Sequence, residues 1–274
     1  MRTLTELLVF VAACGLAFAQ SPSTGNPLTE PSAHLSDFQA LEFRRYIVKE
    51  RERKHFTTYF ESYFPEALEQ TGAIVAGSFS ERKNQNGFTW IRGFHTIEAR
   101  AISNAQFYYG PVWREHRTAV NDLLPDSDNV LLLRPLSPER GVTILQAVDP
   151  VLEPEGARGV VVALIFAVKP NSVEAFAKQA EPTFASYRGT GAREAGVLVT
   201  LDVNNNFPQL PIRTDGPYLV WLGLLKDNEI LEKQFTPVAE SSIQVLSATG
   251  LLRSAPEFVV LDPTPRSRLR WLSQ

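Results

Sequence analysis

The sequence repeats one order of predicted elements, and this repeat constrains the fold more than any other feature. Both occurrences, over residues 41–135 and 159–263, run strand, helix, strand, strand, helix, strand. The segments that correspond are 41–49 with 161–169, 88–93 with 218–223, and 133–135 with 261–263. A βαββαβ unit of about 100 residues is the ferredoxin-like arrangement, an antiparallel sheet with both helices on one face. We therefore predict an α+β chain built from two such units.

The first unit carries clear helix and turn signals. An apolar stripe at helical spacing runs through residues 50–70, formed by Phe56, Tyr59, Phe60, Tyr63 and Phe64. Pro65 should kink or end this helix. The turn-forming residues 84–87 join two apolar strands into a hairpin. Thr96 can cap the next helix, and Gly110-Pro111 should interrupt and restart it.

The second unit differs mainly by an insertion between its second and third strands. Residues 204–211 are rich in Asn and Pro and must form a loop. We expect Asn171 with Glu174 to cap the first helix of this unit and Asp227 to cap the last one. Residues 189–191 predict a turn instead of a phosphate cradle, because no helix follows them.

Each predicted unit leaves one sheet face uncovered, and that face needs a partner. Two units of one chain can pack face to face into a pseudo-twofold barrel; alternatively, each chain pairs with another copy as a homodimer. The expected fold class is tandem ferredoxin-like units in a dimeric α/β barrel-type arrangement. We assign residues 39–136 to the first unit, 137–158 to a linker, 159–265 to the second unit, and 266–274 to a basic tail with a frayed end.

Residues 1–19 match a secretory signal. They contain Arg2, an apolar run of about 12 residues and an Ala17-Phe18-Ala19 cleavage site. The run is too short to span a bilayer. We expect export to the periplasm or the medium, with a polar linker over residues 20–38; lipid attachment at Cys14 is the alternative. After cleavage the chain has no cysteine left for a disulfide, a thiolate nucleophile or a metal site.

Charge and motifs exclude several function classes. A net charge of -3 supplies no field for holding nucleic acid. The sequence lacks a G-x-S-x-G elbow, a phosphate loop, a G-x-G-x-x-G after a strand and an H-E-x-x-H. We therefore expect no cofactor and no metal.

Several motifs of the first unit resemble the NIPSNAP family. They are residues 42–46, 60–64, 88–94, 107–117 and 128–135, and the likeness covers about residues 40–136. The second unit resembles the family only through its pattern. The resemblance implies the dimeric α/β barrel superfamily, which also includes cofactor-free monooxygenases, small isomerases and some haem proteins. It supplies no catalytic residues to carry over.

His116 is the leading catalytic candidate. Either His116 or Arg117 shares a predicted helix stripe with Trp113, and we expect His116 beside an aromatic ring in a pocket between sheet and helices. There an imidazole could shuttle protons or ligate haem iron. The alternative is a packed histidine bonded to a backbone group.

An aromatic and arginine cluster is the leading ligand-binding candidate. Residues two apart on a strand share a face, which pairs Arg44 with Tyr46 and Trp90 with Arg92. Together with Tyr108 and Trp113 they form the predicted binding set. An arginine on such a sheet can clamp a carboxylate or phenolate by a bidentate contact. The alternative is that these arginines pair with Glu42 and that the aromatic rings are core.

These candidates support three hypotheses. The first is an exported binding protein that holds a small, partly apolar ligand or a protein partner in the barrel. The second is a cofactor-independent monooxygenase or isomerase acting on an aromatic or quinone-like compound, with His116 as general base and Arg44 or Arg92 orienting the substrate. The third is an assembly module without a ligand. An enzyme needs an enclosed cavity, whereas a scaffold fills that space with side chains.

Overall fold

The computed structural model describes residues 38–272. The predicted signal segment, which includes Cys14, lies outside the described residues, and so does nearly all of the predicted polar linker.

Both units form the predicted order of elements. The first contains β1 (Ala40–Ile47), α1 (Arg53–Tyr63), α2 (Pro65–Glu69), β2 (Ile74–Glu81), β3 (Gly87–Phe94), α3 (Ile97–Tyr108), α4 (Pro111–Asn121) and β4 (Asp126–Pro135). After a 3-10 turn, η2 (Pro138–Arg140), the second contains β5 (Val160–Ala167), α5 (Val173–Gly189), β6 (Arg193–Thr200), β7 (Tyr218–Leu225), α6 (Asn228–Ile230), the π-helical η3 (Leu231–Phe235), α7 (Thr236–Ser247) and β8 (Glu257–Pro263).

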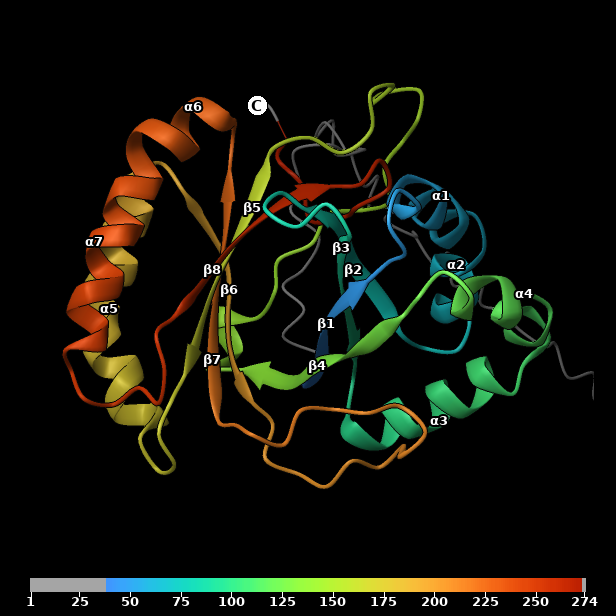
Figure 1. Cartoon of the computed structure of the whole chain (residues 1–274), viewed down its shortest axis with the longest axis horizontal. Coiled ribbons are helices and arrows are strands. Elements are labelled where there is room, and N and C mark those ends of the chain that lie inside the picture. The colour runs from blue at the N-terminus through green and yellow to red at the C-terminus, as the bar shows by residue number, and fades with distance from the viewer. Residues whose placement is uncertain (1–37, 273–274) are drawn as a thin grey trace, which may run out of the picture.

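The strands of the described chain close into one antiparallel barrel in the order β1-β3-β2-β8-β5-β7-β6-β4. Each unit contributes four consecutive strands, and β2–β8 and β4–β6 pairing joins the units. The fold class is therefore confirmed, and the two units cover each other within a single chain. Figure 1 shows the barrel between two helical layers, with α5 and α7 on one side and α1 to α4 on the other.

The barrel interior is a solid core. Alternate strand residues point inward, and Leu41, Phe43 and Ile91 of the first unit meet Val161 and Leu222 of the second. The residues between them in sequence point outward, toward the helices. The barrel core therefore separates the sheet–helix layers of the two units.

The predicted helix signals are confirmed at four positions. Pro65 separates α1 from α2, and Pro111 begins α4. Thr96 Oγ1 accepts a hydrogen bond from the Ala99 amide, and Asp227 Oδ1 accepts one from the Ile230 amide. These helices therefore begin at the positions that proline and capping side chains predict.

The predicted Asn171 cap is wrong. Asn171 has a left-handed backbone with φ near 60°, and α5 begins after Ser172 without a side-chain cap bond. Asn tolerates this conformation, so the residue forms the turn before the helix.

The expected frayed tail is also wrong. Ser267, Leu269 and Arg270 are buried, and the Leu269 amide donates to the Ala76 carbonyl at 2.9 Å. Arginines of the tail pair with carboxylates of α2 and the inter-unit segment: Arg266 with Glu66, Arg268 with Glu69, and Arg270 with Glu153. These partners hold the tail against the barrel end.

Candidate ligand-binding site

A cavity of about 440 Å³ lies between the outer sheet face of the first unit and its helices. Five of the six predicted ligand-binding residues line it: Arg44, Tyr46, Trp90, Tyr108 and Trp113. Arg92, the sixth, lies behind this wall, with its guanidinium carbon 5.1 Å from the centre of the Trp90 ring. Sequence periodicity therefore placed five predicted residues around one space.

Aromatic rings form most of the cavity wall. Phe60 packs edge-on against Trp90 with centroids 5.1 Å apart, and Tyr108 packs edge-on against Trp113 at 4.8 Å. Further rings and aliphatic side chains complete the wall: Phe56, Phe64, Leu68, Phe107, Val120 and Leu124. Such a wall suits a flat, partly apolar molecule.

The insertion of the second unit closes one side of the cavity. Phe207, Gln209, Leu210 and Pro211 from the β6–β7 loop all line it. Phe207 is buried, with its ring centroid 6.0 Å from that of Tyr108. The site therefore combines residues of both units, although its sheet and helices belong to the first.

His116 is not among the residues that line the cavity. Its Nδ1 lies 2.7 Å from the Tyr59 hydroxyl, and its ring stacks on Tyr63 at 3.9 Å. The imidazole does lie beside an aromatic ring as expected, but between α1 and α4. This position corrects the expectation that it reaches a pocket between sheet and helices. On α4 it is Arg117 that continues the cavity-facing stripe from Trp113, and His116 faces α1.

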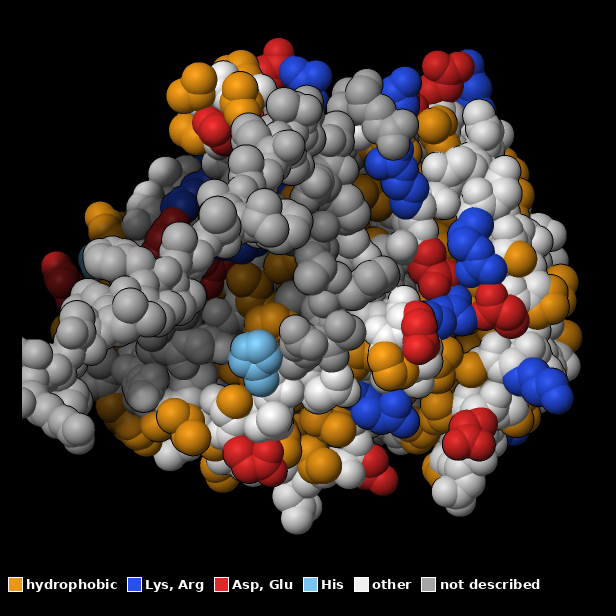
Figure 2. Space-filling view, turned by 180° about the vertical axis from the view of Figure 1, so that it is seen from behind, with side chains coloured by type: hydrophobic (Ala, Val, Ile, Leu, Met, Phe, Trp, Pro, Cys, Tyr) orange, Lys and Arg blue, Asp and Glu red, His pale blue; other side chains and the backbone are white. Residues whose placement is uncertain are grey.

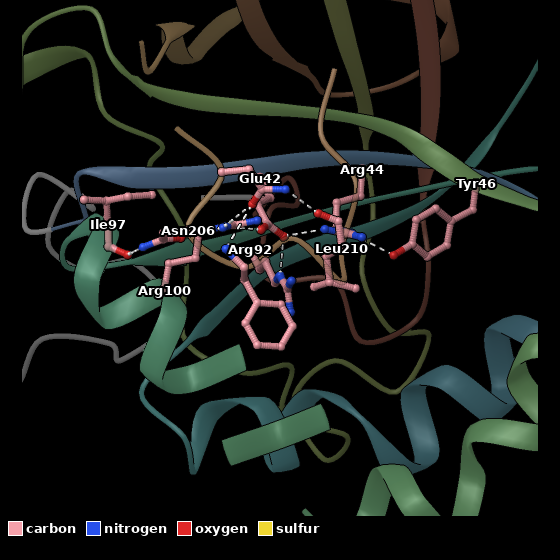
Figure 3. A network of polar contacts seen from close by, with 10 residues as sticks. Glu42, Arg44, Tyr46, Arg92, Ile97, Arg100, Asn206 and Leu210 are labelled. Atoms are coloured by element: carbon pink, nitrogen blue, oxygen red, sulfur yellow. Dashed lines mark hydrogen bonds and ion pairs between the residues drawn. The ribbon is translucent and has the colours of Figure 1, made fainter. Parts of the chain in front are cut away.

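A buried carboxylate lies next to the cavity and receives three guanidinium groups. Glu42 Oε2 accepts from Arg44 Nη1 and Arg92 Nε, and Oε1 accepts from Arg100 Nε, each at 2.6 Å. Figure 3 shows the carboxylate among these groups, which come from β1, β3 and α3. The ion pairing with Glu42 that we considered as an alternative is thus present.

The charge of this cluster is fixed. Burial acts to raise the pKa of Glu42, but the charges of Arg92, Arg44 and Arg100 outweigh it and hold the pKa well below its usual range. Burial raises the pKa of the nearby Tyr108 phenol, against the opposing effect of Arg92. At neutral pH the cluster therefore holds one carboxylate, three cations and a neutral Tyr108.

The same loop that closes the cavity is bonded to this cluster. Arg100 Nη1 donates to Asn205 Oδ1 at 3.1 Å and to Asn206 Oδ1 at 2.7 Å. Asn206 in turn donates to the Ile97 carbonyl at the start of α3.

The Arg44 Nε donates to the Tyr46 hydroxyl at 2.7 Å, which orients Arg44 at the cavity wall.

Sequence reasoning missed Arg100, Asn104 and the loop residues. A signal for the first two exists: Arg100, Asn104 and Tyr108 recur every four residues and share one face of α3. Arg100 and Asn104 are fully buried. The loop carried no comparable signal. Its residues Asn205 and Asn206 contact Arg100, which lies about 100 residues away in the sequence, and periodicity reports only on near neighbours.

The second unit shows what the same positions look like without this site. Strand register places Trp90 opposite Arg44 and Trp221 opposite Leu164, so the two tryptophans are equivalent. This corrects the predicted match of 88–93 with 218–223 by one residue. By the same register, Val162 and Gly223 stand where the first unit has Glu42 and Arg92. The second unit fills the space above its sheet with Phe166, Phe176, Phe184, Tyr187 and Phe235. The fold itself therefore requires neither the cavity nor the charged cluster.

Other site classes are not seen in the part of the chain that the structure describes. Residues 38–272 contain no cluster of three or more His, Cys, Asp or Glu side chains that could hold a metal ion. No helix among them is long and apolar enough to cross a membrane. On the face seen in Figure 2, acidic and basic side chains are interspersed on the side of the second unit.

Comparison with known proteins supports the fold. No protein-family model and no curated protein sequence matches the chain. An anthrone oxidase-like protein of known structure is similar with a TM-score of 0.55 and 12% identity, over 84% of this chain and 93% of that one. A candidate monooxygenase of Fusobacterium nucleatum gives 0.54 and 11%, over 86% and 96%.

NIPSNAP proteins are also among the structural neighbours, but over a smaller part of the chain. A NIPSNAP family protein of unknown function from Agrobacterium tumefaciens shares 22% identity over 37% of this chain and 94% of its own, with a TM-score of 0.34. The two likenesses that span most of the chain establish the dimeric α/β barrel fold and nothing more at these identities.

Proposed function

We propose that this protein binds a small, flat, partly apolar molecule in the cavity between the first sheet and its helices. The observation that carries the proposal is the difference between the units. The second unit packs aromatic side chains above Trp221, whereas the first leaves about 440 Å³ above Trp90. Unfilled apolar space costs stability, so a cavity of this size with a few polar groups favours a ligand.

A filling variant tests this proposal. Leu210 lines the cavity from the β6–β7 loop and is only partly buried, so Leu210→Trp should fill the space without disturbing the core. The neutral probe is 1-methoxy-4-nitronaphthalene, and binding is followed by isothermal titration calorimetry, because both variants add a tryptophan and would alter a fluorescence signal. We expect Leu210→Trp to weaken binding at least about tenfold, or about 1.4 kcal/mol.

The matched control is Val245→Trp, on the exposed surface of α7 in the second unit. It should bind the probe like the natural protein. Equal binding by Leu210→Trp and Val245→Trp would place the probe elsewhere and reject the cavity. Native mass spectrometry of full-length protein recovered from cell extract then identifies the molecule that occupies the site.

A second candidate function is a cofactor-independent monooxygenase or isomerase acting on an aromatic or quinone-like substrate. Arg44 on the cavity wall favours it, because fixed positive charge stabilises a substrate anion as it forms. The fold likeness to an anthrone oxidase-like protein supports it by analogy alone. His116 is not the general base in this proposal, since it does not line the cavity.

Oxygen uptake with anthrone tests the enzyme candidate. Each anthrone should consume one dioxygen and yield anthraquinone and water. The rate should fall in Leu210→Trp and persist in Val245→Trp. Uptake no faster than in buffer would argue against this oxidation, while leaving the binding proposal untouched.

A further inference from the structure

The cluster around Glu42 holds more positive than negative charge. Glu42 contributes -1, and Arg44, Arg92 and Arg100 contribute +3, so the sum is +2. The side chains are at most 2% exposed. Uncompensated charge in a protein interior is costly, and it is usually paired.

Hydrogen-bond donors of this cluster also lack partners. Among the described residues, every buried side-chain polar atom without a partner belongs to Trp90, Arg92, Arg100 or Asn104. Four of these atoms are donors of the indole and guanidinium groups: Trp90 Nε1, Arg92 Nη1, Arg92 Nη2 and Arg100 Nη2. Native proteins rarely leave buried donors unpaired. Of the three residues that hold these donors only Trp90 lines the cavity, and the Arg92 guanidinium faces the rings of Trp90, Phe94 and Tyr108.

The fold does not explain the excess charge. The second unit carries Val162, Leu164 and Gly223 at the positions of Glu42, Arg44 and Arg92 and closes the same barrel. A structural role alone would be served by such apolar residues. The charged cluster is specific to the unit that contains the cavity.

The cluster meets the cavity at Arg44. Arg44 lines the wall, and its bonds to Glu42 and Tyr46 use Nη1 and Nε. Arg92 stands directly behind, with its guanidinium carbon 5.1 Å from the Trp90 ring centre and 6.0 Å from that of Tyr108. The charged groups on the other lining elements are Arg117 of α4 and Asp128 of β4, and both are exposed.

We propose that the ligand carries an acidic oxygen group, a carboxylate, phenolate or enolate, and that its negative charge lies against Arg44 with Arg92 and Arg100 behind. This inference rests on the proposed binding function and adds the chemical class of the ligand. Interior charge of +2 favours the deprotonated form, so the site lowers the pKa of an acid bound there. Trp90 and Tyr108 cover the apolar part of the same molecule.

A coloured acid and its methyl ether test the inference. 4-Nitro-1-naphthol has a coloured phenolate, and 1-methoxy-4-nitronaphthalene has the same shape without an ionisable group. With full-length protein, we expect the pKa of bound naphthol to fall by about one unit or more, read from its visible spectrum. Above its pKa the naphthol should bind at least about tenfold more tightly than the ether.

Arg44→Gln isolates the charge at the wall. It should abolish the preference for the naphthol while the ether keeps its affinity. Arg188→Gln, which breaks the ion pairs of Arg188 with Glu181 of α5 and Glu194 of β6, is the control and should change neither. If Arg44→Gln does not fold, the spectral pKa and the affinity ratio of the natural protein still decide the matter.

The outcomes separate the two proposals. Equal affinity for both probes, with no fall in the pKa of the bound naphthol, overturns the anionic ligand and leaves the binding function standing. Failure of both probes to bind removes the binding function and this inference with it. A lowered pKa and a preference lost in Arg44→Gln support both.

Discussion

Arg100 of α3 donates a hydrogen bond to Asn206 Oδ1 at 2.7 Å, and this bond ties a loop of the second unit to the charged cluster of the first. Glu42 accepts from Nε of the same arginine. The arginine thus connects the buried carboxylate of β1 with the loop that closes the cavity. One side chain therefore bonds to both the first sheet and the second unit's loop.

The first prediction concerns that loop. Asn206→Ala removes the bonds to Arg100 and to the Ile97 carbonyl, and it should cost about 1–3 kcal/mol of stability because a charged donor loses a partner. Hydrogen exchange over residues 204–211 should accelerate, and the probe ether should bind less tightly. The exposed Asn204→Ala serves as control; equal exchange in both variants would mean that the bond does not hold the loop.

The second prediction concerns the buried carboxylate. Glu42→Gln should lower the free energy of unfolding in urea by about 3–5 kcal/mol, because it leaves three buried cations without their shared anion. Glu257→Gln is the comparison, since its ion pair with Arg45 is half exposed and should contribute about 0–1 kcal/mol. Similar losses in the two variants would contradict the central role of Glu42.

The third prediction is a pH dependence with a definite sign. The pKa of Glu42 in the folded protein lies below its ordinary value of 4.5, to which it returns on unfolding. The carboxylate therefore stabilises the fold fully above about pH 5, and this contribution is lost as pH falls toward the folded pKa. The free energy of unfolding should fall from about pH 5 to about pH 3, and less steeply in Glu42→Gln. Parallel curves would assign the slope to other carboxylates.

The fourth prediction separates His116 from the site. His116→Ala should leave the affinity for both naphthalene probes unchanged, because the residue does not line the cavity. It should lower stability by about 1 kcal/mol through loss of the bond to Tyr59. Calorimetry and fluorescence titration measure the two effects. A large loss of affinity for the probes in His116→Ala would contradict this prediction and show that the imidazole contributes to binding.

The fifth prediction concerns the C-terminal segment. Leu269 is 2% exposed and belongs to the barrel core, so Leu269→Ala should destabilise the protein by about 2–5 kcal/mol. The partly exposed Leu272→Ala gives the reference in a urea unfolding experiment. A frayed tail would make the two variants indistinguishable.

Local sequence determined the elements and much of the cavity wall. The repeat predicted both ferredoxin-like units and their face-to-face packing, because hydrophobic periodicity reports directly on helix and strand geometry. Period-two alternation put Arg44 with Tyr46 and Trp90 with Arg92 on one face. Pro65 and Pro111 begin α2 and α4, because a proline lacks the amide hydrogen that the helix interior needs but the first helical position does not.

Tertiary structure decided the rest. The packing of α4 on α1 places His116 beside Tyr59 and outside the cavity. The packing of the two units places Asn206 against Arg100, which lies 106 residues earlier in the chain. Carboxylates at positions 66, 69 and 153 fixed a tail that composition alone marks as loose. Such contacts depend on how separate elements pack, and no local sequence pattern encodes that packing. The elements themselves could be predicted, because helix and strand geometry require a characteristic spacing of apolar residues along the chain.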